Sequence, residues 1–250
     1  AGSDMILFGT PPDPNATWKL DEANRVATPG AVGVPSFLLS GRPISNQVIR
    51  TRLNPGTGDG TLGVVFGFQD LGAFQLFDWR AADLNDPELG VVPAGMRLRS
   101  IHAPEGQYAT ASDLGAGLDS SRVTVLRSDA MPWVAGREYE LVLTLRTDAA
   151  VLEINHSNTN LVTWQVPELA GITGRFGHYA HSAANSRFGP MELPGLAPLI
   201  TGIEPTAAGD WLLQWDNGQA PYLIEARSDL GTGEWKAVAP ATVNQSQSVT

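Results

Sequence analysis

A chain of 250 residues with a net charge of −10 and no cysteine excludes several classes of protein. It has no disulfide framework and no thiolate nucleophile, and its acidic balance disfavours nucleic acid, which binds clustered lysine and arginine. No apolar stretch approaches the ~18 residues that a membrane span requires, so we expect no membrane insertion. The 27 glycines, 18 prolines and only 17% charged residues favour a turn-rich β protein.

Short apolar segments follow in chain order, separated by turn residues, and this pattern predicts strands rather than helices. Turn clusters such as the glycine-rich segment 54–60 separate the strands. The segment Ala82–Gly95 is predicted to be a loop that holds one helical turn at most. The first ten predicted strands are Asn46–Leu53, Thr61–Gln69, Ala73–Arg80, Met96–His102, Arg122–Leu126, Glu138–Arg146, Val151–Asn155, Leu161–Val166, Gly174–His181 and Ser186–Glu192.

Two of these strands alternate between apolar residues on one face and mostly small or polar residues on the other. On the first, Phe66 and Phe68 fall on one face, and on the second Leu141 and Leu143 do so. Because successive side chains in a strand point to opposite faces, each strand has one face toward a core. We therefore expect these four side chains to lie inside an all-β sandwich or barrel.

A change of composition near Leu193–Pro198 predicts a linker, because two prolines and a glycine lie close together there. We expect a sandwich domain over residues 1–192 and a β module over 199–250. The second module is small for a sandwich, so it is either shortened or supported by the first domain. Its predicted strands are Leu199–Glu204, Trp211–Asp216, Tyr222–Ser228 and Trp235–Val238.

The segment Gly63–Asp70, with the sequence GVVFGFQD, resembles the C-terminal lectin-like domain of thrombospondins and its bacterial relatives. The resemblance continues at Trp79, Trp133 and Gly174–Gly177, and parts of it are shared with laminin-G-like and concanavalin-like domains. It implies a jelly-roll sandwich that is secreted or extracellular and serves in binding or adhesion. The tail, with Leu213-Gln214-Trp215, looks like the fibronectin-type-III-like modules of bacterial secreted proteins.

The same resemblance implies a structural calcium ion. Calcium takes six to eight oxygen ligands, and relatives have several acidic residues before the glycine-led strand, whereas this chain has only Asp59. If the strands pair as in the family, Asp59, Asp70 and Asn185 meet at one edge and form the expected site. The alternative is that these acidic and amide residues solvate turns.

No catalytic constellation is evident. Glu138 and Glu140 lack a third carboxylate at glycosidase spacing and are interpreted as a surface pair, and no Gly-x-Ser-x-Gly motif occurs. The segments Arg50–Arg52 and His178-Tyr179 show only a faint similarity to polysaccharide lyases. The prediction is therefore a protein that is not an enzyme.

Glycan binding commonly uses exposed aromatic rings, whose flat apolar faces stack on sugars. Of the candidates Trp18, Trp79, Trp133 and Trp164, Trp79 and Trp133 fall in core-like patterns. We take Trp164 as the candidate platform, with His178 and Tyr179 as further ligand-binding residues. We predict a module that recognises a glycan or another extracellular matrix component. Two alternatives stay open: an accessory domain of a polysaccharide-degrading enzyme, or a lyase or hydrolase in its own right.

Overall fold

The computed structural model describes twelve segments of the chain. Two compact units are present, Ala1–Leu193 and Pro194–Thr250, and each is considered by itself. The described residues are 3–7, 17–30, 33–58, 60–86, 90–116, 120–183, 185–194, 199–205, 211–216, 222–226, 236–242 and 246–249.

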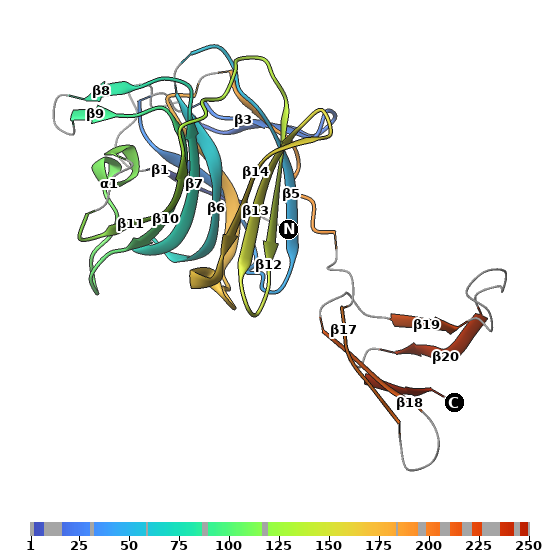
Figure 1. Cartoon of the computed structure of the whole chain (residues 1–250). Helices are drawn as coiled ribbons and strands as arrows, with labels where there is room; N and C mark the ends of the chain where they lie inside the picture. The colour runs from blue at the N-terminus through green and yellow to red at the C-terminus, as the bar shows by residue number, and fades with distance from the viewer. Residues whose placement is uncertain are drawn as a thin grey trace. The chain divides into compact units, whose positions relative to one another are not determined.

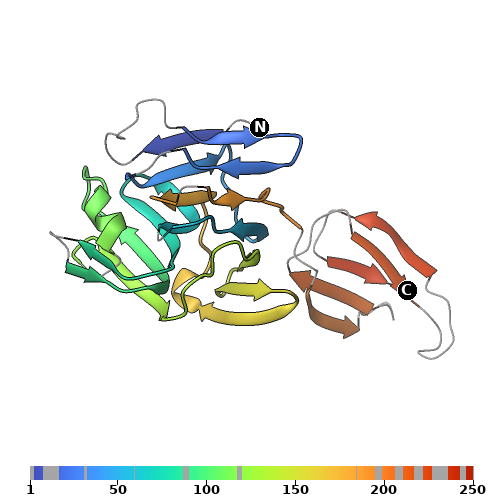
Figure 2. The same ribbon diagram turned by 90° about the horizontal axis from the view of Figure 1, so that it is seen from above.

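The first unit is a sandwich of two seven-stranded antiparallel sheets, here named sheet A and sheet B (Figure 1; Figure 2 from above). The predicted all-β jelly-roll class is confirmed. Sheet A has the order β1-β4-β15-β6-β7-β10-β11, with strands Ser3–Leu7, Ser36–Ser40, Arg175–His181, Thr61–Asp70, Ala73–Arg80, Gly95–His102 and Val123–Asp129. Sheet B has the order β14-β13-β12-β5-β16-β3-β2, with strands Thr159–Val166, Ala150–His156, Tyr139–Leu145, Val48–Asn54, Arg187–Phe188, Val26–Thr28 and Lys19–Asp21.

The main core lies between the two sheets. Phe66 from β6 and the β12 residues Leu141 and Leu143 are buried there, as the alternation predicts. Phe68 is buried as well, but on the opposite face of β6, among a second apolar cluster. The reason is Gly67, whose φ of 58° lies at a register shift that interrupts the alternation.

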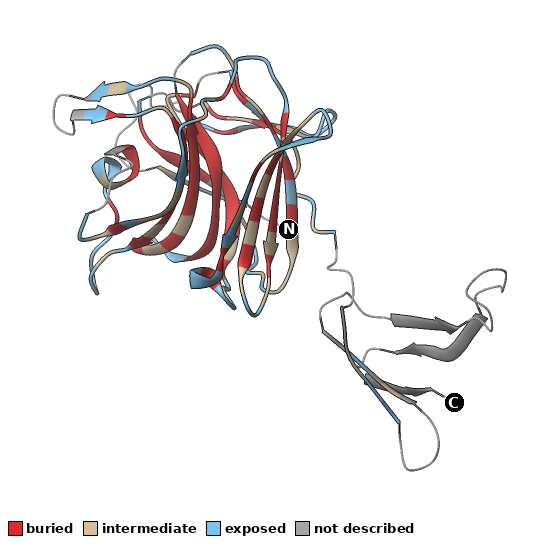
Figure 3. Cartoon of the chain, in the orientation of Figure 1, coloured by how far each residue is buried: buried red, intermediate tan, exposed pale blue. Residues whose placement is uncertain are grey.

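The second apolar cluster covers the outer face of sheet A. It includes Phe37, Phe74 and Tyr179 from the sheet, and Leu114 from the helix α1 (Ala111–Ala116) that packs over it. Figure 3 shows the resulting run of buried positions along β6 and β7. Because the central strands of sheet A are covered on both faces, the outer face of sheet B is the broad strand surface open to solvent.

Two local features differ from the predicted elements. The segment expected to be a loop forms a hairpin of β8 (Leu84–Asp86) and β9 (Gly90–Val92). Four short strands, β1 to β4, precede the first predicted one. A 3-10 turn, η1, spans Pro167–Leu169.

Within the described residues, no helix is both long and apolar enough to cross a membrane.

The second unit contains two small antiparallel sheets. One has the order β17-β18-β21 and the other pairs β19 with β20. The polar C-terminal stretch therefore supplies a strand, β21. The resemblance to fibronectin type III stays a prediction. The strands are Leu199–Pro205, Trp211–Asp216, Ser246–Val249, Tyr222–Ala226 and Lys236–Thr242.

Candidate ligand-binding face

The outer face of sheet B carries a row of paired charges. On β5, Ile49, Thr51 and Leu53 point toward the core, so Arg50 and Arg52 point outward. On the neighbouring β12, the same alternation turns Glu140 outward, and Glu138, just before this strand, lies on the same side. Arg50 Nε lies 3.4 Å from Glu140 Oε1, and Arg52 Nε lies 3.8 Å from Glu138 Oε1.

The first hollow on this face has a volume of about 290 Å³. It forms where the segment after β16 pairs with β5 through two backbone hydrogen bonds between Arg50 and Glu192, of 2.9 and 2.8 Å. Arg25, in the turn before β3, has a left-handed φ of 54° and a guanidinium nitrogen 3.9 Å from the Glu192 carboxylate. The lining residues are Asn24, Arg25, Arg50, Thr51, Arg52, Glu140, Pro190 and Glu192.

The second hollow, of about 600 Å³, shares Arg52 and Glu140 with the first, so the two hollows adjoin on the outer face of sheet B, and we call them together the groove. Its far end is the β13–β14 turn at Ser157-Asn158, where both residues have positive φ, as a tight two-residue hairpin requires. His156 closes this end, with Nδ1 donating to the Glu138 carbonyl oxygen at 2.8 Å. The lining residues are Arg52, Glu138, Tyr139, Glu140, Asn155, His156, Ser157 and Asn158.

The groove offers a balanced set of hydrogen-bonding groups. Its arginines donate only, its carboxylates accept only, and its asparagines do both. Three arginines and three glutamates line the combined groove, so their charges cancel. Such a surface suits a polar, uncharged ligand with many hydroxyl groups.

The structure places His178, predicted to bind ligand, between the sheets. Its Nε2 lies 3.1 Å from Thr51 Oγ1, and its ring packs against Trp18 and Phe188. Burial lowers the pKa of His178 to about 3. Since only 6% of the residue is exposed, His178 packs in the core and does not line the groove.

The buried neutral His178 gives a pH-dependent contribution to stability. In the unfolded chain the imidazole of His178 is protonated below about pH 6.5, whereas in the folded state it stays neutral down to about pH 3. Stability is therefore fully present above pH 6.5 and falls below it, by up to about 1.4 kcal/mol per pH unit. Urea unfolding between pH 7 and 5 should show this slope in the wild type and a shallower one in His178→Gln. His102→Gln, at an exposed histidine, is the control and should keep the slope of the wild type. Equal slopes for the wild type and His178→Gln would contradict the assignment.

The other two predicted ligand residues also lie away from the groove. Tyr179 is fully buried on the outer face of sheet A, where its ring packs edge-on against Phe37. Trp164, on the edge strand β14, is partly buried against the main core, with its ring 6.1 Å from that of Phe77. The structure therefore separates the three residues and provides no shared site for them.

The predicted calcium ligands do not come together as expected. Asp59 lies outside the described residues. Gly60, at the start of β6, lies against Ser182, which places nearby Asn185 at that end of the strand. Asp70 ends the same strand, about 30 Å away at 3.3 Å per residue, so Asp70 and Asn185 cannot share an ion. Among the described residues, no group of three or more His, Asp or Glu could hold a metal.

The spacing of charged residues in the sequence contains a signal for the groove. Arg50 and Arg52 stand two residues apart on one strand, as Glu138 and Glu140 do on another. Two such pairs of opposite sign become a ladder only if their strands are neighbours, and β5 pairs with β12 over a gap of about 85 residues in the chain. Arg25 lies in a turn, for which periodicity gives no signal, whereas Glu192 ends the predicted strand Ser186–Glu192 and forms an isolated β-bridge with Arg50.

By sequence, no protein-family model and no curated protein matches the chain. By structure, it is similar to the carbohydrate-binding module CBM66 from Bacillus subtilis, with 14% identity over 75% of this chain and 92% of that one, at a TM-score of 0.47. It is also similar to a protein of unknown function with a galectin-like fold from Bacillus subtilis (10% identity, 76% and 88% covered, TM-score 0.48).

A further neighbour is congerin II in complex with lactose and MES, with 9% identity over 61% of this chain and 98% of that one, at a TM-score of 0.39. At these identities, a neighbour's ligand does not transfer to this chain, so the chain's own residues decide what it binds.

Proposed function

We propose that the first unit binds a neutral glycan in the groove on the outer face of sheet B, as an extracellular, non-catalytic binding or adhesion module. The observation that carries the proposal is the pair of adjoining hollows that make up this groove, lined together by three arginines and three glutamates. Arg50 and Arg52 face Glu140 and Glu138 across the pairing of β5 with β12, and 39–68% of each of these four side chains is open to solvent.

Sugars match this surface because each hydroxyl group both donates and accepts hydrogen bonds. Two adjacent hydroxyls can accept from an arginine and donate to the glutamate opposite it, and such charge-assisted bonds are stronger than neutral ones. A polyanionic chain would meet three carboxylates, and a polycation three guanidinium groups. The balance of charge therefore favours a neutral glycan over a polyanion or a polycation. It also favours a neutral glycan over a charged matrix protein.

Arg52 and Glu140 lie in both halves of the groove, so their replacement is the sharpest test. Arg52→Ala and Glu140→Gln are each expected to weaken glycan binding about 10- to 150-fold, because a hydrogen bond to a charged group contributes about 1.5–3 kcal/mol. A glycan array with and without EDTA would identify the ligand and its calcium dependence, and titration calorimetry would measure the affinities.

Matched controls are available on the same unit. Arg42 and Glu105 are exposed and line neither hollow, so Arg42→Ala and Glu105→Gln should bind as the wild type does. Unchanged binding by Arg52→Ala and Glu140→Gln would place the site elsewhere. A chain that binds no glycan on the array would contradict the proposal itself.

A lyase or hydrolase activity is the competing function. Arg52, Tyr139 and His156 do line one hollow, which is a combination of residue types found in lyases. However, Tyr139 is only 2% exposed, and its hydroxyl oxygen accepts a 2.9 Å hydrogen bond from the Val134 N–H. Binding therefore fits better than proton transfer by Tyr139, and shortened products after incubation with the bound glycan would reverse this preference. As a binding module, the chain could equally serve as the accessory domain of a polysaccharide-degrading enzyme.

A further inference from the structure

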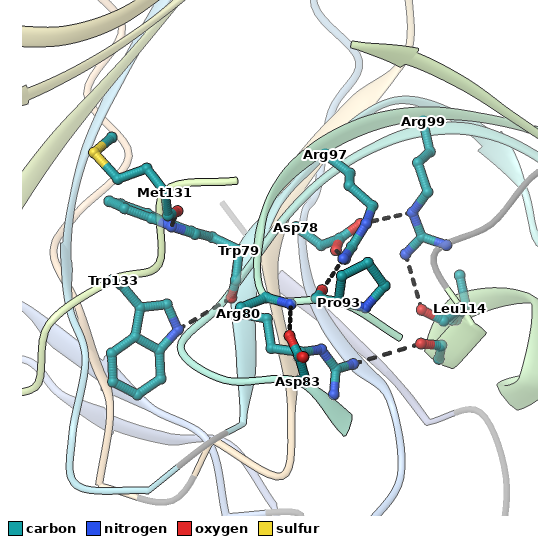
Figure 4. A network of polar contacts seen from close by, with 12 residues as sticks. Asp78, Trp79, Arg80, Asp83, Pro93, Arg97, Arg99, Leu114, Met131 and Trp133 are labelled. Carbon is teal, nitrogen blue, oxygen red and sulfur yellow. Dashed lines mark hydrogen bonds and ion pairs between the residues drawn. The ribbon is translucent and has the colours of Figure 1, made fainter. Parts of the chain in front are cut away.

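A second polar cluster lies on the other side of the sandwich, on the outer face of sheet A. Asp78, Arg80, Arg97 and Arg99 are each at most 5% exposed, beneath the segment that contains α1 (Figure 4). Asp78 receives Arg97 Nη1 at 3.3 Å and Arg99 Nε at 2.6 Å. Two guanidinium groups therefore contact the Asp78 carboxylate, and the third, that of Arg80, is buried close enough to feel its charge.

Three hydrogen bonds from this cluster end on carbonyl oxygens in the last turn of α1. Arg99 donates from Nη1 to the Asp113 oxygen at 2.9 Å and from Nη2 to the Leu114 oxygen at 2.8 Å. Arg80 donates from Nη2 to the Gly115 oxygen at 3.4 Å. The carbonyls at a helix C-terminus lack partners within the helix, so the two arginines fix α1 to the sheet.

Three buried polar atoms beside these arginines have no hydrogen-bond partner among the described residues: Arg80 Nε, Thr61 Oγ1 and the Tyr179 hydroxyl. The sheet register makes them neighbours. Thr61 lies opposite Arg80, and Gly63 lies between Tyr179 on one strand and Asp78 on the other. Gly63 adds no side chain between the three groups, which share the outer face of sheet A, and Arg80 and Tyr179 lie close enough to interact electrostatically.

The charge in this cluster decides what that point would hold. One carboxylate leaves two of the three buried positive charges without an opposite charge, and buried unpaired charge is costly. Burial lowers the pKa of Arg80 below its ordinary value, which reflects this cost. Burial also raises the pKa of Tyr179, so its hydroxyl keeps its proton and can donate. A water molecule could satisfy the same donors, but it would bring no negative charge.

We propose that a small anion, chloride in physiological solution, binds between Arg80 Nε, the Thr61 hydroxyl and the Tyr179 hydroxyl. One N–H and two O–H donors surround it, and it compensates part of the buried positive charge. The anion holds the guanidinium of Arg80 in place, and Arg80 in turn holds the end of α1. The site is separate from the glycan groove and is tested without any glycan.

The test uses the full chain, refolded from denaturant in chloride-free sodium gluconate. Chloride then replaces gluconate at constant ionic strength, and the melting temperature is recorded. Selective binding to the folded state stabilises by mass action, so the melting temperature should rise with the logarithm of the chloride concentration above the dissociation constant. At ten times that constant we expect a rise of about 5 °C for a unit of this size. Equal melting temperatures at all chloride concentrations would show that water occupies the position and would overturn the proposal.

Variants assign the effect to this position. The double variant Thr61→Val and Tyr179→Phe removes both hydroxyl groups with little change in shape, and it should lose the chloride dependence. Ser36→Ala removes another buried hydroxyl of sheet A, which donates to the Ala180 oxygen at 3.2 Å, and it should keep the dependence. A chloride dependence that persists in the double variant would refute the site.

A direct measurement covers the case in which the double variant does not fold. Crystals of the wild-type chain grown in bromide should show anomalous scattering within hydrogen-bonding distance of Arg80 Nε. The absence of bromide from that position would overturn the proposal independently of the melting data.

Discussion

Asp78→Asn is expected to lower the free energy of unfolding by about 3–5 kcal/mol, the range observed when one partner of a buried ion pair is removed. Each carboxylate oxygen of Asp78 receives one arginine, and the residue is only 2% exposed. Asparagine keeps the shape and one acceptor oxygen, but it leaves three buried guanidinium groups without a carboxylate. Chemical denaturation followed by tryptophan fluorescence would measure the loss.

The matched control for Asp78 is the ion pair between Glu168 and Arg127, in which both Glu168 oxygens lie 3.0 Å from the guanidinium. Its glutamate is half exposed, and exposed pairs contribute little because water and salt screen them. Glu168→Gln should therefore leave the unfolding midpoint nearly unchanged. If Asp78→Asn also cost less than about 1 kcal/mol, the cluster would not hold the charges assigned to it.

Phe66→Ala is expected to cost about 3–5 kcal/mol, as other large-to-small substitutions in cores do. Its ring is fully buried between the sheets, where the neighbouring strands restrict collapse around a cavity. Equilibrium unfolding in guanidinium chloride would give the difference from the wild type.

Leu20 is 56% exposed on the edge strand β2, so Leu20→Ala provides the comparison and should stay within about 0.5 kcal/mol. A cost below about 1 kcal/mol for Phe66→Ala would contradict the assignment of the main core.

The sandwich was predictable because its strands alternate in a pattern that depends only on local sequence. The exceptions have local causes. Gly67 interrupts the alternation at a bulge and sends Phe68 to the opposite face from Phe66, which strict periodicity does not foresee. The four strands before residue 46 are short, and all four lie at a sheet edge or next to one, where burial leaves a weaker apolar pattern.

The candidate site was much less predictable than the fold. Residue type alone favours His178 and Tyr179 as ligand-binding residues. However, the central strand β15 is covered on both faces, so His178 packs in the main core and Tyr179 in the second apolar cluster. The groove instead depends on which strands are neighbours, because Arg52 faces Glu140 only through the pairing of β5 with β12. Pairing over such a distance in the chain follows from topology, which residue types and spacing do not specify.

The alternation along β5 and β12 separates two tasks within the same strands. Inward positions such as Ile49 and Leu141 build the core, while the outward positions that line the groove do not contribute to it. Substitutions at outward positions can therefore exchange one ligand for another at little cost in stability. Over evolution, the sandwich can persist while its outward residues change, so descendants of one ancestor can share this architecture and differ in what they bind.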